Sequence, residues 1–276
     1  MDDVRRRLIA DNPVAGARFF HYVVQTFLEC VLGVDAKEVG LFGKTSAYYG
    51  TVEQQGRLTL HLHLVLWIHA AMTPQEIRDK LMSEDSDFQK RMVEYLEASH
   101  QGEFMGGSHE EVMHTVSERE SLPNYTNPIQ NLPTAPPGNC LHSPKEGCDG
   151  CALQKDWWRQ YESSVDDILL KSNMHHCRLG RCYNTGGSCK ARFPRDTFEH
   201  TMLDPETGAL NMKKGESDMN TFSYVMAYLL RCNHDVTSLL SGTALKAVVA
   251  YVTEYVTKSG LKTYQIFDVI KSVFDR

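Results

Sequence analysis

Hydrophobic positions near the start of the chain recur at helical spacing and then change to strand spacing. In residues 14–33 (VAGARFFHYVVQTFLECVLG), which follow a predicted N-cap at Asn12, apolar side chains recur every three or four residues up to a final glycine. This pattern predicts a buried helix. Over residues 40–68 the apolar positions alternate in two arms about a polar centre that contains Gly56, which predicts a β-hairpin.

Helical spacing returns after the second arm. The segment TPQEIRDKLM opens with Thr73 and has Glu76 three residues later, the spacing of a capping box, and acidic helical segments continue to about residue 120. Residues 121–139 hold five prolines and cannot form a regular element, because proline lacks a backbone donor and restricts φ. Residues 221–260 are periodic again. We therefore expect an α+β chain with an internal boundary near residue 121.

Composition narrows the class of protein. The chain has 276 residues and 42% hydrophobic residues, which fits a globular protein with a substantial core. Its longest apolar runs fall short of the roughly 20 residues that a membrane span needs, and its start lacks a signal-peptide core, so we expect an intracellular protein without a membrane partner. The net charge of −6 argues against bulk electrostatic coating of nucleic acid, and any DNA contact must come from a local patch.

The second arm of the hairpin, GRLTLHLHLVLWI, carries His61 and His63 on one face, since alternate residues of a strand share a face. If a three-residue loop turns about Arg57, Glu53 pairs with His61 and Gln55 becomes a diagonal neighbour. Two imidazoles, a carboxylate and an amide oxygen predict an open Mg²⁺ or Mn²⁺ site that polarises a phosphodiester. An isolated HxH pair is more often only a half-exposed strand feature, and the preceding Glu and Gln favour the metal.

A pair of tyrosines lies far downstream in AVVAYVTEYVTKSG. Tyr251 and Tyr255 share a face whether the segment is a helix or a strand, and Lys258 follows one helical turn later. A tyrosine hydroxyl, with a pKa of about 10, is a weak nucleophile that needs a metal or a cation. Taken alone such a pair is usually a packing feature, but with the histidines it predicts nucleophilic attack on a phosphate.

Six of the eight cysteines crowd into one third of the chain together with histidines, which in an intracellular protein favours metal binding over disulfides. The inventory suffices for two tetrahedral structural zinc sites, against the alternative of free thiols. The ligands could close in two separate groups or interleave. The candidate zinc ligands are Cys140, His142, Cys148, Cys151, His175, His176, Cys177, Cys182 and Cys189.

The same region holds a local basic patch with no acidic residue between positions 171 and 195. Aromatic side chains lie in or near it, and cations interleaved with aromatic faces suit unpaired bases and a phosphate backbone. The alternative is that the two tryptophans pack the zinc module. The predicted DNA contacts are Arg178, Arg181, Lys190, Arg192, Arg195, Trp157 and Trp158, with Lys171, Tyr183 and Phe193 as further members of the patch.

Taken together, these motifs resemble a known family. The chain is similar to the N-terminal Rep nuclease part of Helitron transposases, which are HUH endonucleases, with His61-Leu62-His63 as the HUH motif and Tyr251 and Tyr255 as the paired-tyrosine motif. Residues 12–33, 189–196 and 232–242 look like the same family, so the likeness covers nearly the whole chain. Related proteins vary in their third metal ligand, for which Glu53 is the first choice here and Gln55 the second.

The resemblance implies a metal-dependent single-stranded DNA endonuclease that forms a 5′-phosphotyrosine in rolling-circle transposition. It also implies a Rep-type central antiparallel sheet flanked by helices, a zinc-binding insertion, a nuclear location and a C-terminal helicase partner. The chain ends at Arg276 without a phosphate-loop motif, so we expect a nuclease fragment. The expected parts are residues 1–120 (core with the HxH strand), 121–200 (Pro-rich linker and zinc insertion) and 201–276 (core with the tyrosine helix).

Two other functions fit the same residues. One is a non-catalytic, zinc-dependent module that binds single-stranded nucleic acid and derives from a transposon. The other is a metal-dependent phosphodiesterase that uses water, in which the tyrosines are structural.

Overall fold

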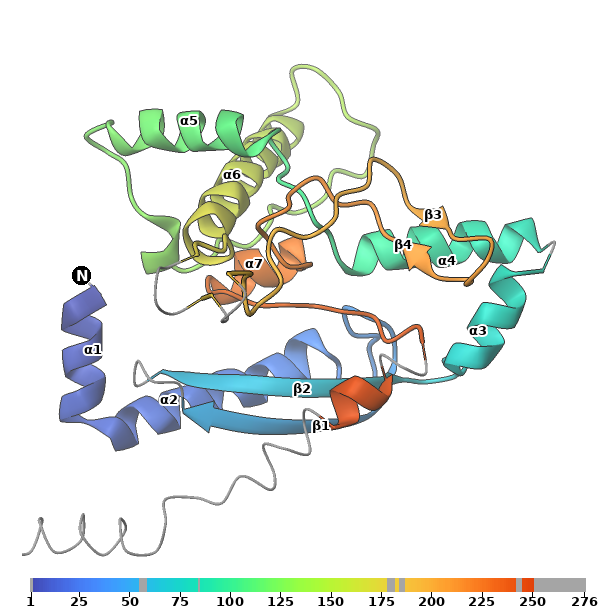
Figure 1. Cartoon of the computed structure of the whole chain (residues 1–276). Coiled ribbons are helices and arrows are strands. Elements are labelled where there is room, and N and C mark those ends of the chain that lie inside the picture. Colours follow the sequence, from blue (N-terminus) through green and yellow to red (C-terminus); the bar gives the residue numbers. More distant parts are fainter. Residues whose placement is uncertain are drawn as a thin grey trace, which may run out of the picture. The chain divides into compact units, whose positions relative to one another are not determined.

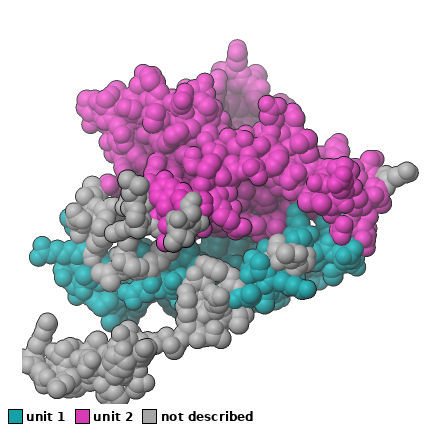
Figure 2. Space-filling view, in the orientation of Figure 1, with its two compact units in different colours: residues 1–77, 239–276 teal, residues 78–238 magenta. Residues whose placement is uncertain are grey.

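The computed structural model describes residues 2–54, 59–83, 85–177, 182–183, 187–241 and 245–250. The chain divides into two compact units, residues 1–77 with 239–276 and residues 78–238 (Figure 2). Within the described ranges, no helix is both long and apolar enough to cross a membrane.

The first unit begins with two helices, α1 (Asp2–Asp11) and α2 (Pro13–Thr26), followed by a π-helical turn, η1 (Phe27–Val31). Asn12 caps α2 as predicted, because its side-chain oxygen accepts a hydrogen bond from the Ala15 N–H at 3.1 Å. The predicted burial of this helix is wrong. Phe19 and Tyr22 of α2 are 69% and 68% exposed, and burial begins only in the turn. Periodicity located the helix, but the covering of its apolar side depends on packing with other segments, about which periodicity carries no information.

A β-hairpin completes the described core of the first unit. Strand β1 (Thr45–Gln54) pairs antiparallel with β2 (Leu60–Ile68), and Glu53 lies directly opposite His61 (Figure 1). The predicted hairpin and the predicted 53–61 pairing are therefore confirmed, although the turn itself lies outside the described residues. This register determines which side chains stand beside the two histidines.

The α+β class is confirmed at the level of a small antiparallel sheet with helices. The described residues hold two two-stranded sheets, β1–β2 and the short pair β3 (Met202–Leu203) with β4 (Leu210–Asn211). A Rep-type central antiparallel sheet, built from strands in both the first and the last part of the chain, remains a prediction.

Helix α3 (Pro74–Leu81) crosses the boundary between the units, and its capping box is confirmed. The Thr73 N–H donates to Glu76 Oε2 at 2.7 Å, and the Glu76 N–H donates to Thr73 Oγ1 at 3.2 Å. The second unit continues with α4 (Ser86–Ser99), α5 (His109–Glu120), the 3-10 turn η2 (Pro128–Gln130), α6 (Asp149–Ser172) and α7 (Tyr224–Leu230). As predicted, the proline-rich residues 121–139 form only that one short turn.

The core of the second unit lies where α6 packs against α5 and α7 (Figure 1). Long apolar side chains at helical spacing on α6 are fully buried, which makes this 24-residue helix the scaffold of the unit. The buried cluster contains Phe104, Val112, Val116, Tyr161, Val165, Ile168, Leu169, Met219, Phe222, Ala227 and Tyr228.

Buried polar contacts attach the proline-rich segment to this core. Asp167 is fully buried on α6, and its Oδ2 accepts a hydrogen bond from the Tyr125 hydroxyl at 2.8 Å. Lys171 forms ion pairs with Asp167 and, at 2.8 Å, with Glu120. The expected boundaries near residues 121 and 201 both fall inside the second compact unit, because contacts such as these join the segments on either side.

Asp166 provides a second long-range contact from α6, and a prediction follows from it. Its two carboxylate oxygens accept the backbone N–H groups of Met105 and Gly106, each at 2.8 Å, and only 6% of the residue is exposed. In Asp166→Asn the amide nitrogen would face one of these donors. We expect a loss of about 2 kcal/mol in the free energy of unfolding, measured by urea denaturation.

The exposed Asp156 on the same helix offers a matched control, and Asp156→Asn should change stability by less than about 0.5 kcal/mol. Equal stability of the two variants would show that Asp166 does not hold this loop.

Candidate metal centres

The hairpin brings two histidines and a carboxylate together on one face of β1 and β2. The rings of His61 and His63 meet edge to face, with 4.7 Å between their centroids. Although Glu53 pairs with His61, its carboxylate reaches diagonally, so that Glu53 Oε2 lies 3.2 Å from His63 Nε2. We call these three residues the histidine face.

The surroundings of His61 favour the neutral form of its imidazole. Partial burial lowers the pKa of His61, the neighbouring His63 lowers it further, and Glu53 opposes the shift. A neutral imidazole keeps the nitrogen lone pair that binds a metal ion. The separation of 3.2 Å between His63 Nε2 and Glu53 Oε2 also suits a divalent cation, since adjacent ligand atoms around an octahedral Mg²⁺ lie about 3 Å apart.

The remaining predicted catalytic residues cannot be placed beside this face. Gln55, Tyr251, Tyr255 and Lys258 lie outside the described residues. Their roles stay predictions.

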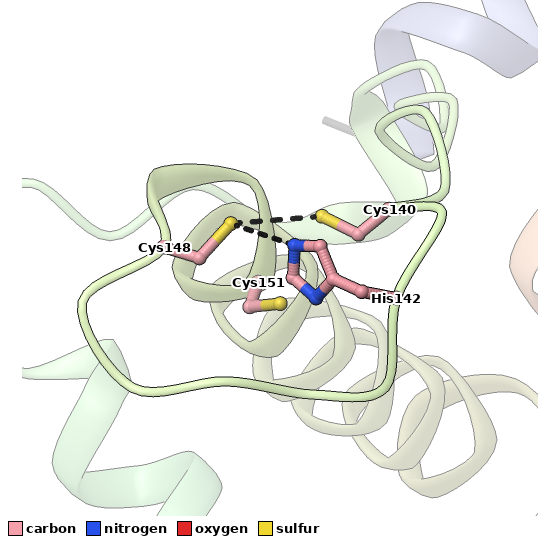
Figure 3. Close-up of side chains that lie close together, drawn as sticks. All are labelled: Cys140, His142, Cys148 and Cys151. Atoms are coloured by element: carbon pink, nitrogen blue, oxygen red, sulfur yellow. Dashed lines mark hydrogen bonds between the residues drawn. The ribbon is translucent and has the colours of Figure 1, made fainter.

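A first Cys/His group lies at the start of α6 (Figure 3). Ligand atoms of Cys140, His142, Cys148 and Cys151 all lie within 4.8 Å of one another, so the group could hold a metal ion. The Cys148 sulfur is 3.8 Å from that of Cys140 and 3.5 Å from His142 Nε2. Three sulfurs and one imidazole nitrogen are a donor set typical of structural zinc.

Helix geometry activates one thiol of this group. Cys148 is the N-cap of α6, and the backbone N–H of Cys151, the Cys140 thiol and His142 lower its pKa to about 7. Hydrogen bonds to Cys151 and Cys148 raise the pKa of Cys140 to about 11. A cation bound by this group would stabilise its three sulfurs as thiolates.

A second Cys/His group forms after α6. Ligand atoms of His175, Cys177 and Cys182 lie within 4.8 Å of one another, and Cys189 joins them with its sulfur 3.3 Å from His175 Nε2. The described cysteines and histidines thus gather in two separate groups, one of the two arrangements expected from the sequence. Which of them share an ion stays a prediction. His176 is exposed and belongs to neither group.

The second group shows two supports that sequence reasoning missed. Backbone N–H groups of Phe193, Ala191 and Arg192 donate to the Cys189 sulfur and lower its pKa. Phe193, predicted to stack on DNA bases, stacks instead on the His175 ring, with 4.2 Å between centroids. The Cys-x-x-x-Phe spacing is the local signal that could have indicated this turn.

These two groups are the described sets of three or more His, Cys, Asp or Glu residues whose ligand atoms lie within 4.8 Å of one another. The histidine face is a looser arrangement in which Glu53 and His63 form the close pair. Zinc binding by the Cys/His groups therefore has the stronger geometric support.

Two of the four aromatic side chains in the predicted DNA-binding patch, Trp157 and Phe193, are used in packing contacts, whereas Tyr183 is 39% exposed. Trp157 stacks on Tyr161 at 5.3 Å, and its indole N–H donates to the Thr134 carbonyl at 3.1 Å. This agrees with the alternative that a tryptophan packs the module. Trp158, by contrast, is 53% exposed.

The basic part is divided in the same way. Lys171 is held in ion pairs, and Arg195 donates to Asn220 Oδ1 at 3.2 Å. Lys190 and Arg192 are exposed. Arg178 and Arg181 lie outside the described residues.

Comparison with known proteins identifies the first part of the chain. Residues 2–66, which include α1, α2, β1 and most of β2, match a family model described as the Helitron helicase-like domain at the N-terminus. No curated protein and no solved structure matches the chain. The match confirms the resemblance for residues 2–66, which hold the HxH strand and the preceding helix. The likeness expected over nearly the whole chain stays a prediction for the remaining residues.

Proposed function

Because residues 2–66 are recognised as the Helitron helicase-like N-terminal domain, we propose that this chain is a Helitron-type HUH endonuclease. It nicks and rejoins single-stranded DNA through a 5′-phosphotyrosine intermediate in rolling-circle transposition. The observation that carries the proposal is the hairpin register, which sets Glu53 against the two histidines within the matched segment.

In this proposal His61, His63 and Glu53, with Gln55 as the alternative third ligand, hold Mg²⁺ or Mn²⁺. When held there, such an ion would supply Lewis-acid polarisation of a phosphate group. The support is the donor set itself, since two imidazole nitrogens and a carboxylate leave positions open for a substrate. The carboxylate beside His63 offsets the charge of the ion.

The tyrosines supply the nucleophile. The hydroxyl oxygen of Tyr251 or Tyr255 forms a bond to phosphorus, and the bond from phosphorus to the DNA 3′-oxygen breaks. The tyrosine proton is lost to solvent and the leaving 3′-oxygen gains one, so the phosphoester is conserved and religation needs no nucleotide. Lys258 orients the phosphate.

The Cys/His groups bind structural zinc and order the loops that carry the basic side chains of the predicted DNA-binding patch. Single-stranded DNA then contacts the exposed side chains of Lys190, Arg192 and Trp158, together with Arg178, Arg181 and Arg195. Trp157 supports Trp158 through the edge-to-face contact of their rings. A helicase domain in the full-length protein supplies the single strand, and the protein acts in the nucleus.

Incubation of the zinc-loaded protein with Mn²⁺ and a random-sequence single-stranded DNA pool tests the proposal. With a 3′ label, the label should migrate with the protein on a denaturing gel and be released by protease. With a 5′ label, a shortened free strand should appear instead. Absence of any protein-bound label in the presence of Mn²⁺ would contradict the tyrosine mechanism.

His63→Ala should reduce adduct formation at least about a hundredfold, because it removes a ligand of the cation. His114→Ala is the matched control, since His114 is an exposed histidine of α5, and it should behave as the wild-type protein. A His63→Ala protein as active as wild type would exclude the histidine face as the metal site.

The better geometry of the Cys/His groups favours a second candidate, the non-catalytic zinc-dependent module that binds single-stranded nucleic acid. It predicts DNA binding that is lost on removal of zinc, with no adduct under any metal. The labelled-DNA experiment therefore separates the two.

A further inference from the structure

Thr51 stands on the histidine face without a partner for its hydroxyl group. It pairs directly with His63 across the hairpin, and it lies two residues from Glu53 on the same strand and the same face. Its Oγ1 atom is buried and makes no hydrogen bond within the described part of the chain. Directly paired residues have Cβ atoms about 5 Å apart, so this hydroxyl lies within reach of whatever His63 binds.

An unpaired buried hydroxyl is costly, at about 1–3 kcal/mol. Valine would occupy the same strand position with equal β-propensity and nearly equal volume, and it would carry no such cost. Buried polar groups in folded proteins are paired with few exceptions, and an exception indicates a partner such as an ion or water. The Thr51 hydroxyl therefore indicates a polar occupant on the histidine face.

The neighbouring side chains decide what that occupant is. Two imidazoles and a carboxylate stand on the same face of the hairpin as Thr51, and Glu53 already lies close to His63 Nε2. This donor set suits a hydrated divalent cation, which keeps several of its waters when protein ligands are few. Each such water is a strong hydrogen-bond donor that needs an acceptor.

We propose that the Thr51 hydroxyl accepts a hydrogen bond from a water of the cation held by His61, His63 and Glu53. Thr51 is thus a positioning residue rather than a ligand. The inference rests on the proposed metal site, but it does not depend on DNA cleavage.

Titration calorimetry with Mn²⁺ on the zinc-saturated, DNA-free protein tests it. Thr51→Val keeps the shape and removes the hydroxyl, and it should weaken Mn²⁺ binding about tenfold, the usual effect of losing a partner of a bound ligand. Thr51→Ser keeps the hydroxyl and should stay within about twofold of wild type. Thr59→Val, which removes an exposed hydroxyl from the same hairpin, should leave Mn²⁺ affinity unchanged.

A second measurement separates this role from a purely structural one. Without Mn²⁺, Thr51→Val should unfold at the same or a higher urea concentration than wild type, because it removes an unpaired buried group. Unchanged Mn²⁺ affinity in Thr51→Val overturns the inference. It is also overturned if the wild-type protein binds no Mn²⁺, or if His63→Ala does not weaken the Mn²⁺ binding. A protein that binds Mn²⁺ through Thr51 but forms no DNA adduct would instead overturn only the proposed endonuclease function.

Discussion

Replacing both Tyr251 and Tyr255 with phenylalanine is expected to abolish the covalent protein–DNA adduct. Phenylalanine retains the ring and loses only the hydroxyl that bonds to phosphorus. Removal of a catalytic nucleophile typically reduces the rate by more than about a thousandfold, so labelled protein should fall below detection on the denaturing gel. Mn²⁺ binding should be unchanged, since neither tyrosine is a proposed ligand.

The single variants separate two roles. If one tyrosine makes the first cut and the other receives the second strand, one single variant loses the adduct and the other retains it. Tyr22→Phe is a suitable control, because Tyr22 is 68% exposed on α2. An adduct that survives in the double variant would refute the tyrosine mechanism. Cleavage without an adduct in wild type would favour the water-dependent phosphodiesterase.

The second large effect concerns the first Cys/His group. Cys148→Ser is expected to lose one of two zinc ions per chain and to lower the unfolding temperature by roughly 10 °C. The physical reason is that residues 140–148, which carry three of the four candidate ligands, contain no regular element and no buried residue, so that a bound ion would supply much of their order. Elemental analysis and differential scanning calorimetry measure the two quantities.

Cys177→Ser should remove the other ion independently, since the two groups do not share ligands. Cys30→Ser is the control, because Cys30 is exposed and distant in sequence from both groups, and it should keep two zinc ions. If Cys148→Ser retained both ions, the first group would not be a zinc site. Loss of both ions from either variant would mean that the groups depend on one another.

Local features of this protein follow from the sequence alone. Asn12 and the Thr73–Glu76 pair cap their helices as predicted, because a cap involves residues only a few positions apart. The pairing of Glu53 with His61 was also predictable, since a hairpin centred on residue 57 leaves one register. Both predictions rest on short-range geometry with few alternatives.

The tertiary structure alone decided which distant residues meet. It separated the clustered cysteines and histidines into two groups that could hold a metal ion, packed the half-buried Trp157 against Tyr161 and Thr134, and exposed the apolar side of α2. It also left the Thr51 hydroxyl buried and unpaired among the described residues. Residue spacing determines the face on which a side chain lies, whereas its neighbours depend on the packing of segments far apart in the chain, for which periodicity carries no information.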